Sequence, residues 1–276
     1  MSYLSSFPES LYIPKNIQQY NLKCLIGENT AQKSNLVICG LIRDAEKHIS
    51  FLVRRIEKLG SMFKSYKVVL YENDSIDQTK NLLKVWSSLN KNVEIISEVL
   101  KRERNEQDHS LKRRQDMAYY RNKYLTRVNE LESDYVIILD TDIHGFSYNG
   151  ILNTLGWDLD VCGSNGVVYT NDKDGKVRRF YYDSWAYLDK ENKSEQEKNL
   201  MTFQNGEDPI EVDSCFGGLA IYKSKVLKDV KYEDWSCDHV TLHKQIKDNG
   251  YKIWLNPSNT VLYTTHYYEN YLGYIL

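Results

Sequence analysis

The stretch NLVICGLIRDAEKHISFLVRRIEKLGSMFKSYKVVLYEN, residues 35–73, decides the predicted fold. It begins and ends with short apolar runs, 35–43 and 66–72, that are typical of buried strands. Between them, residues 44–60 place apolar side chains at helical spacing and end on a glycine, which predicts a helix. A strand, a helix and a second strand in this order predict a right-handed crossover between parallel strands.

The same alternation continues along the first half of the chain. We expect helices over 75–90 and from the charged stretch 101–114 through Val128, and strands over 93–97, 134–140 and 159–169. Strands separated by helices predict an α/β fold with a mostly parallel central sheet flanked by helices. In such sheets, ligands bind at the carboxyl ends of the strands.

The second half of the chain is less regular. It predicts two short strands around a Gly-Gly turn over 211–224, a helix over 237–250 and strands over 251–258 and 260–266. The charged, asparagine-rich segment 189–208 is predicted to be a surface loop. It is either a passive insertion or a lid that closes over a bound substrate.

Composition narrows the classes of function. The net charge is −2, with 36 basic and 38 acidic residues, so we expect no nucleic-acid partner. Five cysteines at irregular spacing, without a CxxC pair, indicate free thiols in a reducing compartment. The first residues lack the pattern of a signal peptide, and the longest apolar runs fall far short of the ~20 residues of a transmembrane helix. We therefore expect a cytoplasmic protein without a transmembrane segment.

Two carboxylates, Asp140 and Asp142, follow the predicted strand 134–140 with one residue between them. At a strand end both can face one divalent cation, and Mn²⁺ or Mg²⁺ takes carboxylate oxygens together with a diphosphate. The pattern therefore predicts a metal-diphosphate site. The competing interpretation is a solvated turn with two acidic residues.

Acidic and amide side chains also follow the strand 66–72. Glu72, Asn73 and Asp74 suit the base and ribose of a nucleotide, because they can pair with edge N–H groups and vicinal hydroxyls. The other interpretation is helix capping by Asp74 or Ser75, with Asp77 in the first turn. The two roles are compatible.

The ordered series of motifs resembles the GT-A class of glycosyltransferases over about residues 35–266. It consists of a strand followed by 72-ENDSIDQT-79, then 120-YRN-122, a strand ending in 140-DTD-142, and 237-CDHVTLHKQIKDNGYKIWLNPS-258. Three segments, 71-YENDS-75, 182-YDSWA-186 and 212-VDSCFGG-218, are further similar to the fungal capsule-associated α-mannosyltransferase-like family. That family tends to have an Asn-Asp pair where this chain has 140-DTD-142.

The resemblance implies a donor site. Asp74 would contact the nucleotide, and Asp140 and Asp142 would bind ribose and metal. His266 matches the position of a further metal ligand in many GT-A enzymes, although a structural role is equally compatible with the sequence. The residues expected to bind the nucleotide-sugar are Arg43, Glu72, Asp74, Arg121 and Asp140.

The resemblance also implies a catalytic base. Asp238 stands where inverting GT-A enzymes place an acidic residue that takes the proton of the acceptor hydroxyl. It could instead cap the helix that it opens. Asp213 and Glu233 are the reserve candidates. His239 and His243 stand one helical turn apart, but the HExxH zinc pattern is absent, so we expect them on a helix surface.

These observations predict a metal-dependent glycosyltransferase that moves a hexosyl or pentosyl group from a UDP- or GDP-sugar to a hydroxyl of a glycan or glycoconjugate. Residues 1–34 would be an N-terminal extension, 35–145 the nucleotide-sugar-binding half and 146–276 the acceptor-binding half of one domain. One alternative is a sugar-nucleotide nucleotidyltransferase, but the segment 40–45 after the first strand has only one glycine. The other is a non-catalytic carbohydrate-binding protein, which would not need the acidic pairs.

Overall fold

The computed structural model describes residues 7–104, 108–171 and 174–263. The chain forms two compact units. The described residues of Met1–Ala31, Ile143–Ile221 and Lys252–Leu276 make up unit 1, and those of Gln32–Asp142 and Tyr222–Tyr251 make up unit 2. Strand β9 (Leu219–Lys223) carries the chain from unit 1 into unit 2.

Unit 2 is built on four parallel strands in the order β3-β2-β1-β4. Its elements are β1 (Asn35–Ile42), α2 (Ile49–Gly60), β2 (Ser65–Asn73), α3 (Thr79–Leu89), β3 (Val93–Glu98), α4 (Leu111–Asn129), β4 (Tyr135–Leu139), the short 3₁₀ helix η3 (Ser224–Leu227) and α7 (Asp238–Asp248). The four predicted strands and the helices between them are confirmed. The fold class predicted from the sequence, a mostly parallel α/β sheet flanked by helices, is also confirmed.

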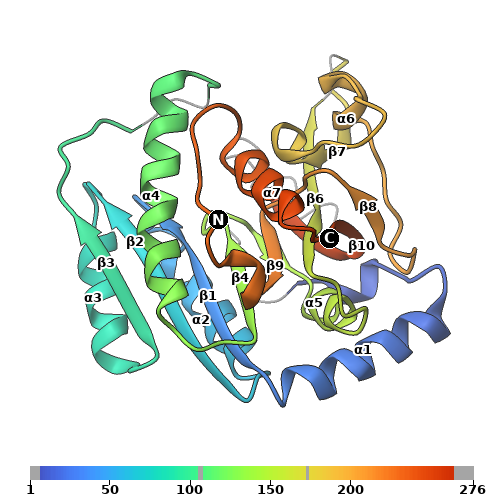
Figure 1. Ribbon diagram of the computed structural model, residues 1–276, viewed down its shortest axis with the longest axis horizontal. Helices are drawn as coiled ribbons and strands as arrows, with labels where there is room; N and C mark the ends of the chain where they lie inside the picture. Colours follow the sequence, from blue (N-terminus) through green and yellow to red (C-terminus); the bar gives the residue numbers. More distant parts are fainter. Residues whose placement is uncertain (1–6, 105–107, 172–173, 264–276) are drawn as a thin grey trace. The chain divides into compact units, whose positions relative to one another are not determined.

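The order of the strands indicates where a ligand crevice would lie in unit 2. The chain steps from β1 to β2 to β3 in one direction and then returns past β1 to form β4. Because such crossovers are right-handed, α2 and α3 lie on one face of the sheet and α4 on the other (Figure 1). The direction reverses between β1 and β4, so the carboxyl ends of these two strands flank the switch point where open α/β sheets bind ligands.

Two helices of unit 2 begin later than the sequence predicts. Helix α2 begins at Ile49 instead of residue 44, and α3 begins at Thr79 instead of residue 75. The residues between the predicted and observed starts form loops whose backbone N–H groups are bound by side chains of the opposite loop. Those bonds replace the first helical turns.

Unit 1 is of mixed strand direction. Its elements are η1 (Glu9–Leu11), α1 (Ile17–Ala31), β5 (Gly145–Phe146), α5 (Tyr148–Leu155), β6 (Val161–Asn171), β7 (Val177–Tyr182), η2 (Ser184–Ala186), α6 (Glu195–Asn199), β8 (Ile210–Val212) and β10 (Ile253–Tyr263). Strands β6 and β10 are parallel, and β5, β7 and β8 pair antiparallel to them. Where the sequence predicts two strands, β10 is continuous, with a shift of register against β6 between Asn256 and Thr260.

Helix α1 was not expected from the sequence. It packs on α5 so closely that a Cβ added at Gly27 would lie 1.8 Å from the carbonyl oxygen of Leu152. A Cβ at Gly156 would lie 2.0 Å from the carbonyl oxygen of Lys23. The contact is therefore made by backbone and glycine. No helix in the described part of the chain is long and apolar enough to cross a membrane.

The segment 189–208 is partly helical. Helix α6 begins with a capping box formed by Ser194 and Glu197. The other end of the segment 189–208 is bound to neighbouring parts of unit 1. The Gly206 N–H donates to Ser258 Oγ at 2.9 Å, and the Asn205 carbonyl accepts the Lys15 N–H at 2.8 Å. The lid function stays a prediction.

Candidate active site

The turn after β4 presents Asp140 and Asp142 at the switch point of unit 2. All five residues of β4 are buried, Asp142 is exposed and the Asp140 side chain is 20% exposed. Between them, the buried Thr141 donates its hydroxyl to the carbonyl of Leu41 in β1 at 2.7 Å. This hydrogen bond ties the turn to the neighbouring strand and holds both carboxylates at the carboxyl edge of the sheet.

A buried arginine lies beside this turn. Arg121, in the middle of α4, places Nη2 3.5 Å from Asp140 Oδ1. Its Nε donates to Asp238 Oδ2, and its Nη1 donates to the hydroxyl of Tyr124 at 3.1 Å. Arg121 therefore joins α4, the β4 turn and the first residue of α7 in one charged cluster.

Asp238 is the buried partner of this arginine. Burial alone would raise the pKa of Asp238, but the facing Arg121 guanidinium outweighs it and holds the pKa far below its usual range. A carboxylate with so low a pKa is a weak base. Asp238 is the first residue of α7, the N-cap is Cys237, and Cys237 makes no side-chain cap hydrogen bond. The negative charge of Asp238 is nevertheless stabilised by the partial positive charge at the N-terminus of α7.

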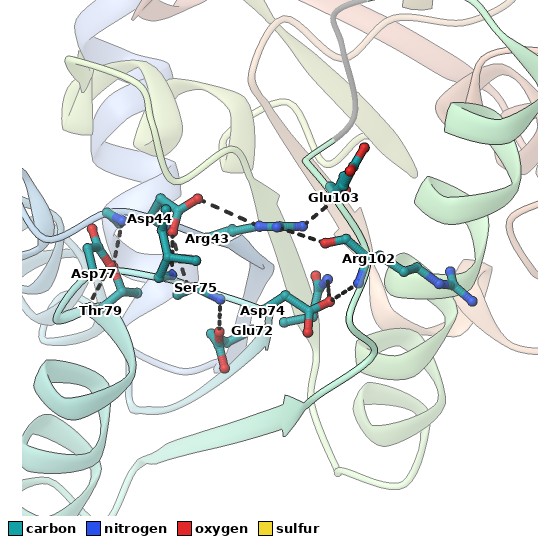
Figure 2. Close-up of polar contacts among 12 residues, drawn as sticks. Arg43, Asp44, Glu72, Asp74, Ser75, Asp77, Thr79, Arg102 and Glu103 are labelled. Carbon is teal, nitrogen blue, oxygen red and sulfur yellow. Dashed lines mark hydrogen bonds and ion pairs between the residues drawn. The ribbon is translucent and has the colours of Figure 1, made fainter.

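The loops that follow β1 and β2 clasp each other (Figure 2). The Asp44 N–H donates to Ser75 Oγ at 3.2 Å, and Asp44 Oδ1 accepts the Ile76 N–H at 2.9 Å. The same exchange recurs two residues on, where the Glu46 N–H donates to Asp77 and the Gln78 N–H donates to Glu46. Helix α3 has Gln78 as its N-cap, so neither Asp74 nor Ser75 caps it.

Asp74 fixes a third loop at the same edge. Its carboxylate accepts the backbone N–H groups of Leu100, Lys101 and Arg102 at 2.8, 2.9 and 3.1 Å. Partial burial would raise the pKa of Asp74, but these donors and the amide of Asn73 lower it to about 2. The carboxylate thus stays charged at neutral pH and holds the segment after β3 against the end of β2.

Glu72 and Arg43 are also engaged by the protein. The fully buried Glu72 accepts the Ser75 N–H at 3.0 Å and the Ser97 hydroxyl at 2.5 Å. The Arg43 guanidinium donates to the carbonyls of Arg102 and Glu103 at 2.9 and 3.5 Å and lies 3.6 Å from Asp44 (Figure 2). Three loops at the carboxyl edge are therefore locked together by charged side chains.

The remaining predicted site residues lie elsewhere in the chain. Asp213 belongs to unit 1, where it is half-buried and its N–H donates to the carbonyl of Leu188 at 2.8 Å. His266 lies outside the described residues. The other predicted site residues belong to unit 2 and fall into two networks: Arg43, Glu72 and Asp74 in the locked loops, and Arg121, Asp140 and Asp238 in the charged cluster, with Asp142 on the turn of Asp140.

The expectation for His239 and His243 was wrong. Both are buried, and His243 Nε2 lies 2.9 Å from the hydroxyl of Tyr222. Burial lowers the pKa of both imidazoles, which keeps them neutral inside unit 2. Within the described ranges, no group of three or more His, Cys, Asp or Glu side chains is placed to hold a metal ion.

Two carboxylates on one turn nevertheless suit a particular class of cation. Mg²⁺ is commonly held by one or two carboxylates, with substrate phosphates and water completing its shell, and Mn²⁺ takes similar oxygen ligands. Asp142 is exposed and Asp140 is accessible, so their oxygens can reach such an ion. The donor set therefore fits a hard divalent cation that is shared with a diphosphate.

The pairing of Arg121 with Asp238 was not predicted. The two residues are 117 positions apart, and the sequence carries no sign of their contact beyond the motifs in which each stands. The role of Thr141 as the tether of the turn was missed as well.

The fold is of the GT-A type, with a parallel sheet whose switch point lies at the carboxyl ends of β1 and β4. Three solved glycosyltransferases are similar. GalNAc-T7 with UDP, GalNAc and Mn²⁺ shares 14% identity over 84% of this chain and 44% of its own, with a TM-score of 0.50. The mannosyltransferase PcManGT from Pyrobaculum calidifontis, with GDP-Man and Mn²⁺, shares 12% identity over 89% of this chain and 64% of its own, with a TM-score of 0.53. S. aureus TarS with UDP-GlcNAc shares 15% identity over 84% of this chain and 59% of its own, with a TM-score of 0.52.

The family of this chain is assigned by its match to a family model. The family described as "Cryptococcal mannosyltransferase 1" matches residues 35–252, and the chain belongs to this family. The family is one of glycosyltransferases, as the motifs predict. No curated protein matches the chain. The chain spans less than two thirds of the length of each of the three solved proteins.

Proposed function

We propose that this chain transfers a sugar from a nucleotide-diphosphate donor, such as a UDP- or GDP-sugar, to a hydroxyl of a glycan or glycoconjugate acceptor. The observation that carries the proposal is the turn Asp140–Asp142 at the switch point, tethered by Thr141 and backed by the buried Arg121. A family of mannosyltransferases and three similar folds bound to nucleotides support it.

Asp140 and Asp142 would hold Mn²⁺ or Mg²⁺ in this proposal. When bound, the cation would neutralise the negative charge that develops on the diphosphate leaving group. Arg121 adds a fixed positive charge behind Asp140. His266 remains a proposed further ligand.

Glu72, Asp74 and Arg43 would act mainly by shaping the nucleotide pocket. Their charged atoms already bind backbone and hydroxyl groups of the three locked loops. A rigid edge of this kind keeps the base and ribose in one orientation without reorganisation on binding. Asp140, on the tethered turn, is the proposed ribose contact.

Asp238 would position Arg121. A carboxylate whose pKa is held low by a buried guanidinium keeps that guanidinium in place, but it takes up a proton poorly. Asp213 and Glu233 stay the reserve candidates for a base.

Thermal unfolding with and without metal tests the donor site. We expect GDP or UDP to raise the unfolding temperature only in the presence of Mn²⁺ or Mg²⁺, because the diphosphate and the two carboxylates repel each other without it. A hundredfold excess over the dissociation constant corresponds to about 2.7 kcal/mol of added stability. Equal protection with and without metal would contradict the proposed site.

A further inference from the structure

A groove of about 440 Å³ lies in unit 2, between α4 and the segment 231–235. Helix α4 contributes Gln115, Ala118 and Asn122 to its wall. The other wall is Lys231–Trp235, here named the Trp235 loop. Tyr232 links this groove to the charged cluster, since its ring lies under Arg121 and its hydroxyl lies 3.1 Å from that of Tyr124.

The Trp235 loop is held rigidly. Asn122 binds Tyr232 twice, because its amide nitrogen donates to the Tyr232 carbonyl and its oxygen accepts the Tyr232 N–H, both at 2.9 Å. Gln245 binds the backbone of Lys231 in the same two-fold way. At the other end, Arg114 donates to the carbonyl of Trp235 at 2.8 Å. The loop is therefore ordered before any ligand arrives.

The side chains of the loop combine an open aromatic ring with hydrogen-bond acceptors. Trp235 is 51% exposed, and its indole N–H already donates to Glu233 Oε2 at 2.8 Å. The polar edge of the ring is thus satisfied, and the open part is apolar. Glu233 and Asp234 are half-buried carboxylates, and Gln115 adds an exposed amide. An apolar face beside several polar acceptors suits a sugar ring, which has apolar C–H faces and hydroxyls at its rim.

The groove also lies at the edge of the sheet where the donor site is. Gln115, Ala118 and Asn122 belong to the first two thirds of α4, which follows the carboxyl end of β3. Asn122 adjoins Arg121 in sequence, and Trp235 precedes Asp238 by three residues. Both neighbours belong to the charged cluster beside Asp140.

We propose that the Trp235 loop and α4 form the subsite for the acceptor saccharide. A hexose or pentose ring stacks on Trp235, and its hydroxyls donate to Glu233 and Asp234. The inference rests on the proposed function, since it assigns the acceptor of the same reaction to a place on this chain.

Saccharide binding without a donor tests the subsite. The full chain is titrated calorimetrically with mannotriose, xylotriose and N,N′-diacetylchitobiose. We expect at least one of them to bind, and Trp235→Ala to weaken that binding by about tenfold, the loss typical of an aromatic anchor. Trp235→Phe, which keeps a stacking ring, is expected to stay within about threefold of the parent. Val85→Ala removes an apolar side chain of similar exposure, 55%, from α3 and serves as the matched control.

Two results would overturn the proposal: binding of none of the three saccharides, or a loss of less than about threefold in Trp235→Ala. Unfolding temperatures establish that each variant is folded. Protection by GDP or UDP with Mn²⁺ is measured on the same samples, and we expect Trp235→Ala to leave it unchanged. If the parent chain is not protected by GDP or UDP with Mn²⁺, the donor site is refuted. If the nucleotide protects the parent but no saccharide binds, only the acceptor subsite is refuted.

Discussion

Replacing Asp238 by Asn removes one charge from the buried cluster and leaves the shape of the side chain. The side chains of Arg121 and Asp238 are only 5% and 7% exposed, so the guanidinium would lose its nearest partner without gaining water. Breaking a buried ion pair in this way costs about 3–5 kcal/mol. Asp140, whose oxygen lies 3.5 Å from the same guanidinium, offsets part of the loss, so we expect a value near 3 kcal/mol.

Urea denaturation at pH 7 measures this loss. Because the total stability of a domain is about 5–15 kcal/mol, the shift of the transition is large enough to resolve. Asp248→Asn is the matched control: it lies on the same helix, and it and its partner Lys244 are each 60% exposed. We expect that change to stay within about 1 kcal/mol. Equal stability of Asp238→Asn and the parent would refute the role of the buried pair.

The pH dependence of the difference gives a second test. Since the pKa of Asp238 is lowered in the folded state, its stabilisation is complete above the unfolded pKa of about 3.9 and is lost as the pH falls through the lower folded pKa. The difference in the free energy of unfolding between the parent and Asp238→Asn should therefore be constant above about pH 5 and should decrease below it. A gap that does not narrow would show that the charge of Asp238 is not what stabilises the fold.

Three further predictions follow from the site and its surroundings. Asp142→Ala should abolish transfer, by about three decades or more, with an unchanged unfolding temperature, because the side chain is exposed; retained activity with a nucleotide-sugar would exclude it as a metal ligand. Asp74→Asn should lower the free energy of unfolding, measured in urea at pH 7, by about 1–3 kcal/mol, since an amide cannot accept all three backbone N–H groups. The difference in unfolding free energy between variant and parent should shrink as the pH falls towards the Asp74 pKa of about 2, and a variant as stable as the parent at pH 7 would argue against the role of Asp74 in holding the loop. Shortening residues 189–208 to a Gly-Ser linker should raise donor hydrolysis relative to transfer if the segment is a lid, and an unchanged ratio would make it a passive insertion.

The parallel half of the fold was predictable because its strands and helices differ in apolar period. Strand β4 is an unbroken apolar run, and α2 buries the residues that recur at helical spacing, such as Leu52, Ile56 and Leu59. Helix α1 escaped prediction because it has no such stripe. Its apolar Leu22 and Leu25 are exposed, and its closest contact is made by a glycine.

The candidate site was predictable only where strand ends mark it. The turn Asp140–Asp142 follows a buried strand, so its position could be derived from the sequence. The pair of Arg121 and Asp238 depends on how α4 and α7 pack, and no local pattern records that packing. Asp74 shows the converse case, in which the residue was found but its carboxylate turned out to bind three backbone N–H groups of the protein.

The clasp between the loops after β1 and β2 also constrains how the sequence can vary. Asp44 and Ser75 exchange bonds with each other's loop, and so do Glu46 and Asp77. A substitution that removes the acceptor at one of these positions leaves a backbone N–H of the opposite loop without its partner, and no change of side chain on that loop replaces it. Positions 44, 46, 75 and 77 are therefore each expected to keep a hydrogen-bond acceptor among relatives of this chain, independently of one another, whereas the exposed Ile76 can vary.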